Sequence, residues 1–270
     1  MGRAYHGRMS EPVELVVHEW PPRAGLADGV ARVAVLVHGV TGWWKTWWRV
    51  GPALAERGWR VIAVDQRAHG RSPAGGLATP DDLARDLEAA IERETTTPVD
   101  ALVGHSLGAA VSQRLAWMRP GIARRMVLED PPGIVRQDDT EWLDRLRAEV
   151  VAARERPDEE VRRELAENPS WRKEDALLDV EGRARCREDV IIDSVRLGRS
   201  FEVVELAAEI RVPTRYILAS LDRSVMPAAP RRRLLANLPR GSDAVVLDGG
   251  HTLHRDRCDE YVAAVLEFIG

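Results

Sequence analysis

One stretch of this sequence, residues 98–118, constrains the fold more than any other. A short apolar run ends in Gly104-His-Ser-Leu-Gly108, and an apolar, helix-favouring segment follows at once. Strand, sharp turn and helix form the context in which Gly-x-Ser-x-Gly is a nucleophile elbow. Such a turn lifts the Ser106 hydroxyl clear of the sheet, and the new helix directs free N–H groups at an anion formed there. A strand-to-helix turn with an incidental serine is the alternative interpretation.

Further strand-like runs lie on both sides of this stretch, separated by segments with helical spacing. Most are nearly continuous and rich in β-branched residues, as in parallel strands covered on both faces. They lie at 13–20, 31–37, 59–65, 124–130, 214–220 and 244–248. The alternation implies right-handed strand–helix–strand units. The sequence therefore predicts an α/β fold with a mostly parallel, twisted sheet and helices on both faces.

The pattern changes between residues 134 and 209. Strand-like runs vanish there, Arg and Glu dominate, and apolar residues recur at helical spacing, as in Leu143, Leu146 and Val150. We therefore predict an all-helical insertion over 134–209 in a core built from residues 1–133 and 210–270.

Charge and composition exclude several classes of partner. The 39 Lys and Arg residues and 43 Asp and Glu residues give a net charge of −4, which argues against nucleic acid or a membrane surface as a charge-driven partner. Neither a secretory signal nor an apolar run of about 18 residues is visible, so we expect a cytoplasmic protein with no membrane span. Nothing in the composition indicates an oligomeric state.

The cysteines and the histidine pair near the end of the chain do not predict a metal site. Cys186 and Cys258 lie far apart without metal-ligand spacing, and a disulfide framework is not expected either. His251 and His254 form a His-x-x-His pair, but no third ligand follows them. We predict no metal and no cofactor.

Five short motifs resemble those of the α/β-hydrolase superfamily, and they occur in its order. They are His38-Gly39, Asp65-x-Arg-x-His69-Gly-x-Ser72, Gly104-His-Ser-Leu-Gly108, Leu221-Asp222 and Gly249-Gly-His251. The resemblance covers the chain outside the helical insertion and implies an α/β-hydrolase fold in which that insertion is a cap. The sequence departs from the family at Ala68, where glycine is usual, and at Ala109-Ala110 after the elbow.

The resemblance implies a triad of serine, histidine and acid. Ser106 needs a base because a serine hydroxyl is a poor nucleophile at neutral pH, and His251 would take and later return its proton. A carboxylate should orient the imidazole. Asp222 is the first choice because the family usually carries its acid after this strand. Glu129 and Asp130, after the strand that follows the elbow, remain alternatives.

The resemblance also assigns the oxyanion hole and the supporting loops. Two N–H donors must point at the developing alkoxide, and they would be the backbone amides of Val40 and Leu107. His38 and Asp65-Gln-Arg67 are predicted to brace these loops through hydrogen bonds.

Tryptophans crowd around the oxyanion loop and recur in the insertion. Each of them could simply pack in the core. Their density beside the site nevertheless favours an aromatic pocket wall, formed by Trp43 and Trp44 with Trp142 and Trp171 from the insertion.

These features predict a serine hydrolase that cleaves an ester or lactone of a small apolar or aromatic molecule. Ser106 argues against haloalkane dehalogenases and epoxide hydrolases, which need an Asp nucleophile. Carbon–carbon bond hydrolases and cofactor-free perhydrolases use the same triad and stay open. A catalytically slow ligand sensor on a hydrolase fold is the alternative of a different class.

Overall fold

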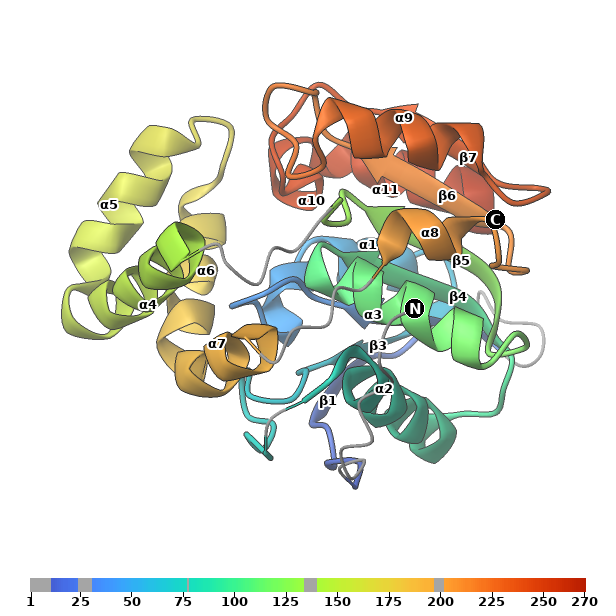
Figure 1. The fold of residues 1–270 in the computed structure, drawn as a ribbon, viewed down its shortest axis with the longest axis horizontal. Helices are drawn as coiled ribbons and strands as arrows, with labels where there is room; N and C mark the ends of the chain where they lie inside the picture. Colours follow the sequence, from blue (N-terminus) through green and yellow to red (C-terminus); the bar gives the residue numbers. More distant parts are fainter. Residues whose placement is uncertain (1–10, 24–30, 77, 134–139, 197–201) are drawn as a thin grey trace.

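The computed structural model describes residues 11–23, 31–76, 78–133, 140–196 and 202–270. Its centre is a seven-stranded sheet in the order β1-β3-β2-β4-β5-β6-β7 (Figure 1). The strands are β1 (Val17–Trp20), β2 (Arg32–Val37), β3 (Trp59–Val64), β4 (Val99–His105), β5 (Ala123–Glu129), β6 (Thr214–Leu218) and β7 (Asp243–Val246). All neighbouring strands are parallel except β1, which runs antiparallel to β3. The predicted α/β fold is confirmed.

The register of the central strands aligns their carboxyl ends. Val37 of β2 pairs with Gly104 of β4, and Gly104 pairs in turn with Leu128 of β5. The loops that follow β2, β4 and β5 therefore leave the sheet side by side. In open α/β sheets, ligands bind beyond such carboxyl ends.

Helices cover both faces of the sheet, which explains the continuous apolar strand sequences. One apolar cluster joins the sheet to α2 (Pro80–Glu94), α3 (Leu107–Met118), α8 (Val203–Ala207) and α9 (Ala228–Ala236). On the other face, a second cluster joins it to α1 (Val50–Ala55) and α11 (Cys258–Ile269). The short helices η1 (Trp44–Trp47) and α10 (Leu253–Asp256) lie beside this second layer.

Between β5 and β6 the structure describes five helices, and Figure 1 shows the first four of them gathered to one side of the sheet. These four are α4 (Thr140–Glu155), α5 (Pro157–Glu167), α6 (Lys173–Arg185) and α7 (Glu188–Arg196), and we call them the helical insertion. Two small apolar clusters, around Leu146 and around Trp171, hold them together. Helix α8 also lies within the range predicted for the insertion, but Val203 and Val204 pack in the core cluster.

Two expectations drawn from composition can be compared with the structure. Cys186 and Cys258 are both free and buried, so they form no disulfide. Of the helices that the structure describes, none combines the length and the apolar character needed to cross a membrane.

Candidate active site

The residues 104–108 form the strained turn that the sequence predicts. Ser106 lies between β4 and α3 with φ 51° and ψ −115°, a conformation that L-residues rarely adopt. A Cβ on Gly104 would lie 2.5 Å from the carbonyl oxygen of Gly108, and one on Gly108 would lie 2.1 Å from that of Val37. Only glycine permits this close approach of backbone to backbone. Ser106 therefore sits at the tip of a strained strand-to-helix turn, the geometry predicted for a nucleophile elbow.

The loop after β2 lies directly against this elbow. A Cβ on Gly39 would lie 3.1 Å from the Cβ of Ser106, so the next residue, Val40, follows beside the serine. Leu107 is the first residue of α3, where backbone N–H groups have no partner within the helix. The two residues predicted as oxyanion donors thus lie next to Ser106, one in the loop after β2 and one at the start of α3.

Buried hydrogen bonds fix the loop after β2. His38 Nδ1 donates to the Gly39 carbonyl at 2.7 Å, and its Nε2 accepts from the Gln66 amide at 3.0 Å. Complete burial lowers the pKa of His38 to about 4, which keeps the ring neutral. The Asp65 carboxylate accepts from the Trp44 amide at 2.7 Å. The predicted bracing role of His38 and the 65–67 segment is confirmed.

The side chain of His251 is paired with Asp130. His251 Nδ1 donates to Asp130 Oδ2 at 2.7 Å, and Asp130 is fully buried directly after β5. Burial alone would raise the pKa of Asp130. The hydrogen bonds from His251, from the Ser224 hydroxyl (2.6 Å) and from the Val225 amide (3.1 Å) outweigh burial, so the pKa lies below its ordinary value. This carboxylate is ionised and fixes the tautomer of His251.

The structure corrects the first choice of acid. Asp222 is exposed in the turn after β6, and its carboxylate does not contact His251. That same turn lies against Asp130, and Ser224 and Val225 in it donate hydrogen bonds to the Asp130 carboxylate. The Ala219 amide donates a longer hydrogen bond of 3.3 Å to the same carboxylate. Asp130 directly follows β5, the neighbour of β4, and the turn after β6 supplies hydrogen-bond donors to its carboxylate. Asp130 was the alternative left open by the sequence.

A second acid–histidine pair lies beneath the first. Glu129 accepts from the backbone amide of His254 at 3.0 Å and from its Nδ1 at 2.9 Å. Burial raises the pKa of Glu129 and holds the pKa of His254 well below its usual range. Glu129, the other alternative acid, is therefore committed to His254 rather than to His251.

His105, Glu129 and His254 form the group of described residues that could ligate a metal, since their donor atoms lie within 4.8 Å of one another. Two of their ring nitrogens form hydrogen bonds, whereas His254 Nε2 is buried without a partner among the described residues. His254 Nδ1 faces the Glu129 carboxylate, and His105 Nε2 donates to the carbonyl of His251 at 3.0 Å. The arrangement is a buried network that seats His251 beside the elbow, with the His105 and His251 rings 4.7 Å apart.

The four tryptophans predicted to line a pocket occupy different environments. Trp43 is buried and donates from Nε1 to the Leu178 carbonyl of α6 at 3.1 Å. Trp44 stacks on the ring of His18 in β1, with the ring centres 3.7 Å apart. Trp142 and Val40 each pack against the apolar cluster around Leu146. Trp171 donates from Nε1 to Asp256 at 2.8 Å. A role in substrate binding stays a prediction for each.

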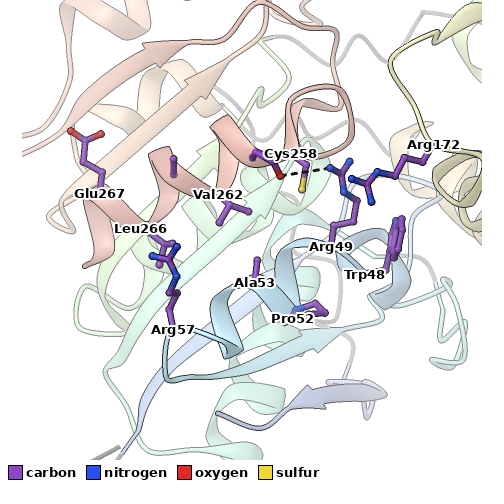
Figure 2. A pocket seen from close by; sticks show the side chains of 12 residues that line it. Trp48, Arg49, Pro52, Ala53, Arg57, Arg172, Cys258, Val262, Leu266 and Glu267 are labelled. Carbon is purple, nitrogen blue, oxygen red and sulfur yellow. Dashed lines mark ion pairs between the residues drawn. The ribbon is translucent and has the colours of Figure 1, made fainter. Parts of the chain in front are cut away.

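A groove of about 890 Å³ lies between α1 and α11 (Figure 2). Ala53, Val262 and Arg49 are among the residues that line it. None of the candidate catalytic residues does, so this groove is not the substrate site that the elbow serves.

Two contributors to the site carry no recognisable sequence signal. Ser224 holds Asp130 by a hydroxyl hydrogen bond, and Asp256 accepts from the backbone amide of Gly250, directly before His251. Neither belongs to a motif, because each acts through a contact across the fold. The position of Asp130 directly after the strand that follows the elbow was the available signal for the acid that pairs with His251.

The chain is similar to known hydrolases over almost its whole length. The family model described as "Alpha/beta hydrolase family" matches residues 34–264. Lipase LipV of Mycobacterium tuberculosis is 31% identical over 276 residues, covering 96% of this chain and 98% of that protein. An sn-1-specific diacylglycerol lipase of Mus musculus is 26% identical, covering 92% of this chain and 85% of that protein. The solved structure of E-2-(acetamidomethylene)succinate hydrolase superposes with a TM-score of 0.74 at 25% identity, covering 96% of this chain and 98% of that chain.

Proposed function

The chain belongs to the alpha/beta hydrolase family, and we propose that it is a serine hydrolase that cleaves a carboxylic ester or lactone of a small apolar or aromatic molecule. The observation that carries the proposal is the hydrogen bond between His251 and a buried, ionised Asp130, beside a strained elbow serine. Two relatives named as lipases support ester chemistry.

In the proposed acylation step, Ser106 Oγ attacks the carbonyl carbon of the substrate. His251 Nε2 takes the hydroxyl proton, and the charge on the resulting imidazolium is balanced by Asp130. The electron pair of the carbonyl moves to its oxygen, which the amides of Val40 and Leu107 stabilise. When the tetrahedral intermediate collapses, the proton on His251 passes to the departing alkoxide, and an acyl-enzyme remains on Ser106.

Water completes the proposed cycle. His251 takes a proton from water as the water oxygen attacks the acyl carbon, and the same oxyanion donors hold the second intermediate. Collapse returns the proton to Ser106 Oγ and releases the carboxylic acid. For a lactone, the alcohol and the acid leave as one molecule.

We also infer that residues 134–209 act as a cap that selects the substrate. The packing of Val40 against the apolar cluster that contains Leu143 and Leu146 of helix α4 supports this inference, because it joins the oxyanion loop to the insertion. An apolar contact there favours substrates with an apolar or aromatic acyl group.

The experiment is turnover of p-nitrophenyl butyrate and of a panel of lactones by the wild-type protein and by Ser106→Ala. We expect hydrolysis by the wild type and a loss of at least about 1,000-fold in kcat for the variant. Thr252→Ala, in the same loop as His251, serves as a matched hydroxyl deletion and should retain activity. Equal rates for wild type and Ser106→Ala, or no turnover of the whole panel, would contradict the proposal.

A further inference from the structure

The carboxylate of Asp256 joins the helical insertion to the loop that carries His251. Its Oδ1 accepts from Trp171 Nε1 at 2.8 Å and from Ser170 Oγ at 2.9 Å, both in the segment between α5 and α6. Its Oδ2 accepts from the backbone amide of Gly250, the residue directly before His251. The two oxygens of one side chain therefore hold two separate parts of the molecule.

Asp256 and Leu253 lie close to the two glycines before His251. A Cβ on Gly250 would lie 2.9 Å from Asp256 Oδ2, and one on Gly249 would lie 2.7 Å from Leu253 Cδ2 and 3.2 Å from the Cβ of Asp256. A side chain at Gly250 would therefore crowd the carboxylate that binds this loop.

Neighbouring contacts tie the same segment to the insertion. The Arg255 guanidinium lies 4.6 Å from the centre of the Trp171 ring and forms an ion pair with Asp179 of α6. Trp171 is only 9% exposed. A buried indole between a guanidinium and a carboxylate has little freedom to move. A displacement of the segment between α5 and α6 would therefore also displace the Asp256 carboxylate.

The other groups that hold His251 belong to the core. Asp130 binds its side chain, His105 binds its carbonyl, and Glu129 fixes the amide of His254 three residues later. Asp256 adds a tether that reaches the insertion. The loop that carries His251 is thus held both by the core and, through Asp256, by the insertion.

We propose that Asp256 is a positioning residue that couples the helical insertion to His251. When Asp256 holds the segment between α5 and α6, it also holds the His251 loop so that the imidazole is oriented for proton transfer. The inference rests on the proposed serine-hydrolase function. A small displacement of a catalytic group lowers the rate of the chemical step far more than it weakens substrate binding.

The chain offers a matched control for this contact. Trp48 Nε1 donates to Asp175 Oδ1 at 2.8 Å, and this bond also joins the core to the insertion. Its acceptor lies in α6 and its donor directly after η1, so it does not touch the histidine loop. Trp171→Phe and Trp48→Phe each remove one indole-to-carboxylate hydrogen bond of the same length.

The experiment compares these two variants with p-nitrophenyl butyrate. Both should lower the melting temperature by a similar amount. We expect Trp171→Phe to lower kcat about five- to tenfold with KM within about twofold, and Trp48→Phe to leave both constants within about twofold. Equal kcat values for the two variants would overturn the proposal.

Asp256→Asn tests the carboxylate itself. The amide keeps one acceptor oxygen, so it can hold Gly250 or the pair formed by Ser170 and Trp171, but not both. We expect a loss in kcat at least as large as that of Trp171→Phe, again with little change in KM. A rise in KM with an unchanged kcat would overturn the proposed coupling between the insertion and His251.

A readout independent of turnover separates this inference from the proposed function. The proton that His251 Nδ1 shares with Asp130 should give a downfield proton NMR signal. We expect Trp171→Phe to shift or broaden it and Trp48→Phe to leave it unchanged. If Ser106→Ala proved fully active while this difference held, the proposed function alone would fail. If both variants left the signal unchanged, the coupling would fail.

Discussion

His251 Nδ1 donates a hydrogen bond of 2.7 Å to Asp130, a fully buried carboxylate directly after β5. Asp130 has φ 35°, so the chain turns sharply as it leaves the strand. The turn after β6 contributes the Ser224 hydroxyl and the Val225 amide to the same carboxylate. The loops after β5, β6 and β7 therefore meet at one ionised acid. Their meeting point decides which residue can orient His251.

The first prediction concerns the choice of acid. Asp130→Asn should lower kcat about 1,000- to 10,000-fold, because an amide can donate to Nδ1 and stabilise the wrong tautomer of His251. Asp222→Asn should leave kcat within about twofold, because Asp222 is exposed in its turn. Steady-state hydrolysis of p-nitrophenyl butyrate measures both variants. The reverse result, with Asp222→Asn inactive, would show that Asp222 is the functional acid after all.

The second prediction concerns backbone strain at Ser106. Its φ of 51° costs an L-residue about 1–3 kcal/mol, whereas glycine adopts positive φ freely. Ser106→Gly should therefore have a free energy of unfolding about 1 kcal/mol higher than that of Ser106→Ala, after allowance for the greater freedom of unfolded glycine. Urea unfolding monitored by circular dichroism measures the difference. Both variants lack the nucleophile, so equal stabilities would mean that the elbow is not strained.

The third prediction follows from the burial of His38. Its pKa is about 4 in the folded protein and 6.5 in the unfolded chain. Between these values the unfolded chain binds the proton and the folded protein does not, so stability rises with pH across this window. Lowering the pH from 7 to 5 should cost about 2 kcal/mol through His38 alone.

His38→Gln tests this assignment, because glutamine can still bond the neighbouring backbone but does not titrate. The loss of stability between pH 7 and pH 5 should be about 2 kcal/mol smaller in the variant than in the wild type. His69→Gln is a second variant with the same expectation, since burial lowers the pKa of His69 to about 3. An unchanged pH dependence in both variants would contradict the prediction.

Much of the fold could be predicted because its determinants are local. Most of the strands follow from nearly continuous apolar runs, and the elbow follows from Gly104 and Gly108, which each prevent a backbone collision. The antiparallel direction of β1 does not follow from its local sequence. The direction of an edge strand depends on the end of the sheet from which the chain approaches.

The acid and the tryptophans could not be predicted from local pattern. Asp130 and Asp222 each follow a strand, and only the path of the turn after β6 decides which of them meets His251. Trp43 adjoins the oxyanion loop in sequence, but Gly182 of α6 leaves the room that its indole fills, so it packs toward the insertion. Such choices are made by contacts between distant segments.

The last prediction tests how closely α3 must approach the sheet at the elbow. A Cβ on Gly108 would lie 2.1 Å from the carbonyl oxygen of Val37 and 2.5 Å from that of His38, and backbone cannot move aside as a flexible side chain can. Gly108→Ala should therefore lower the free energy of unfolding by about 3 kcal/mol, as overpacking a rigid core does. Gly121→Ala is the control, because a Cβ there meets nothing within 4 Å, and it should change stability by less than about 0.5 kcal/mol. If Gly108→Ala were as stable as Gly121→Ala, α3 could shift away from β2, and the elbow would be looser than the close contacts of Gly108 require.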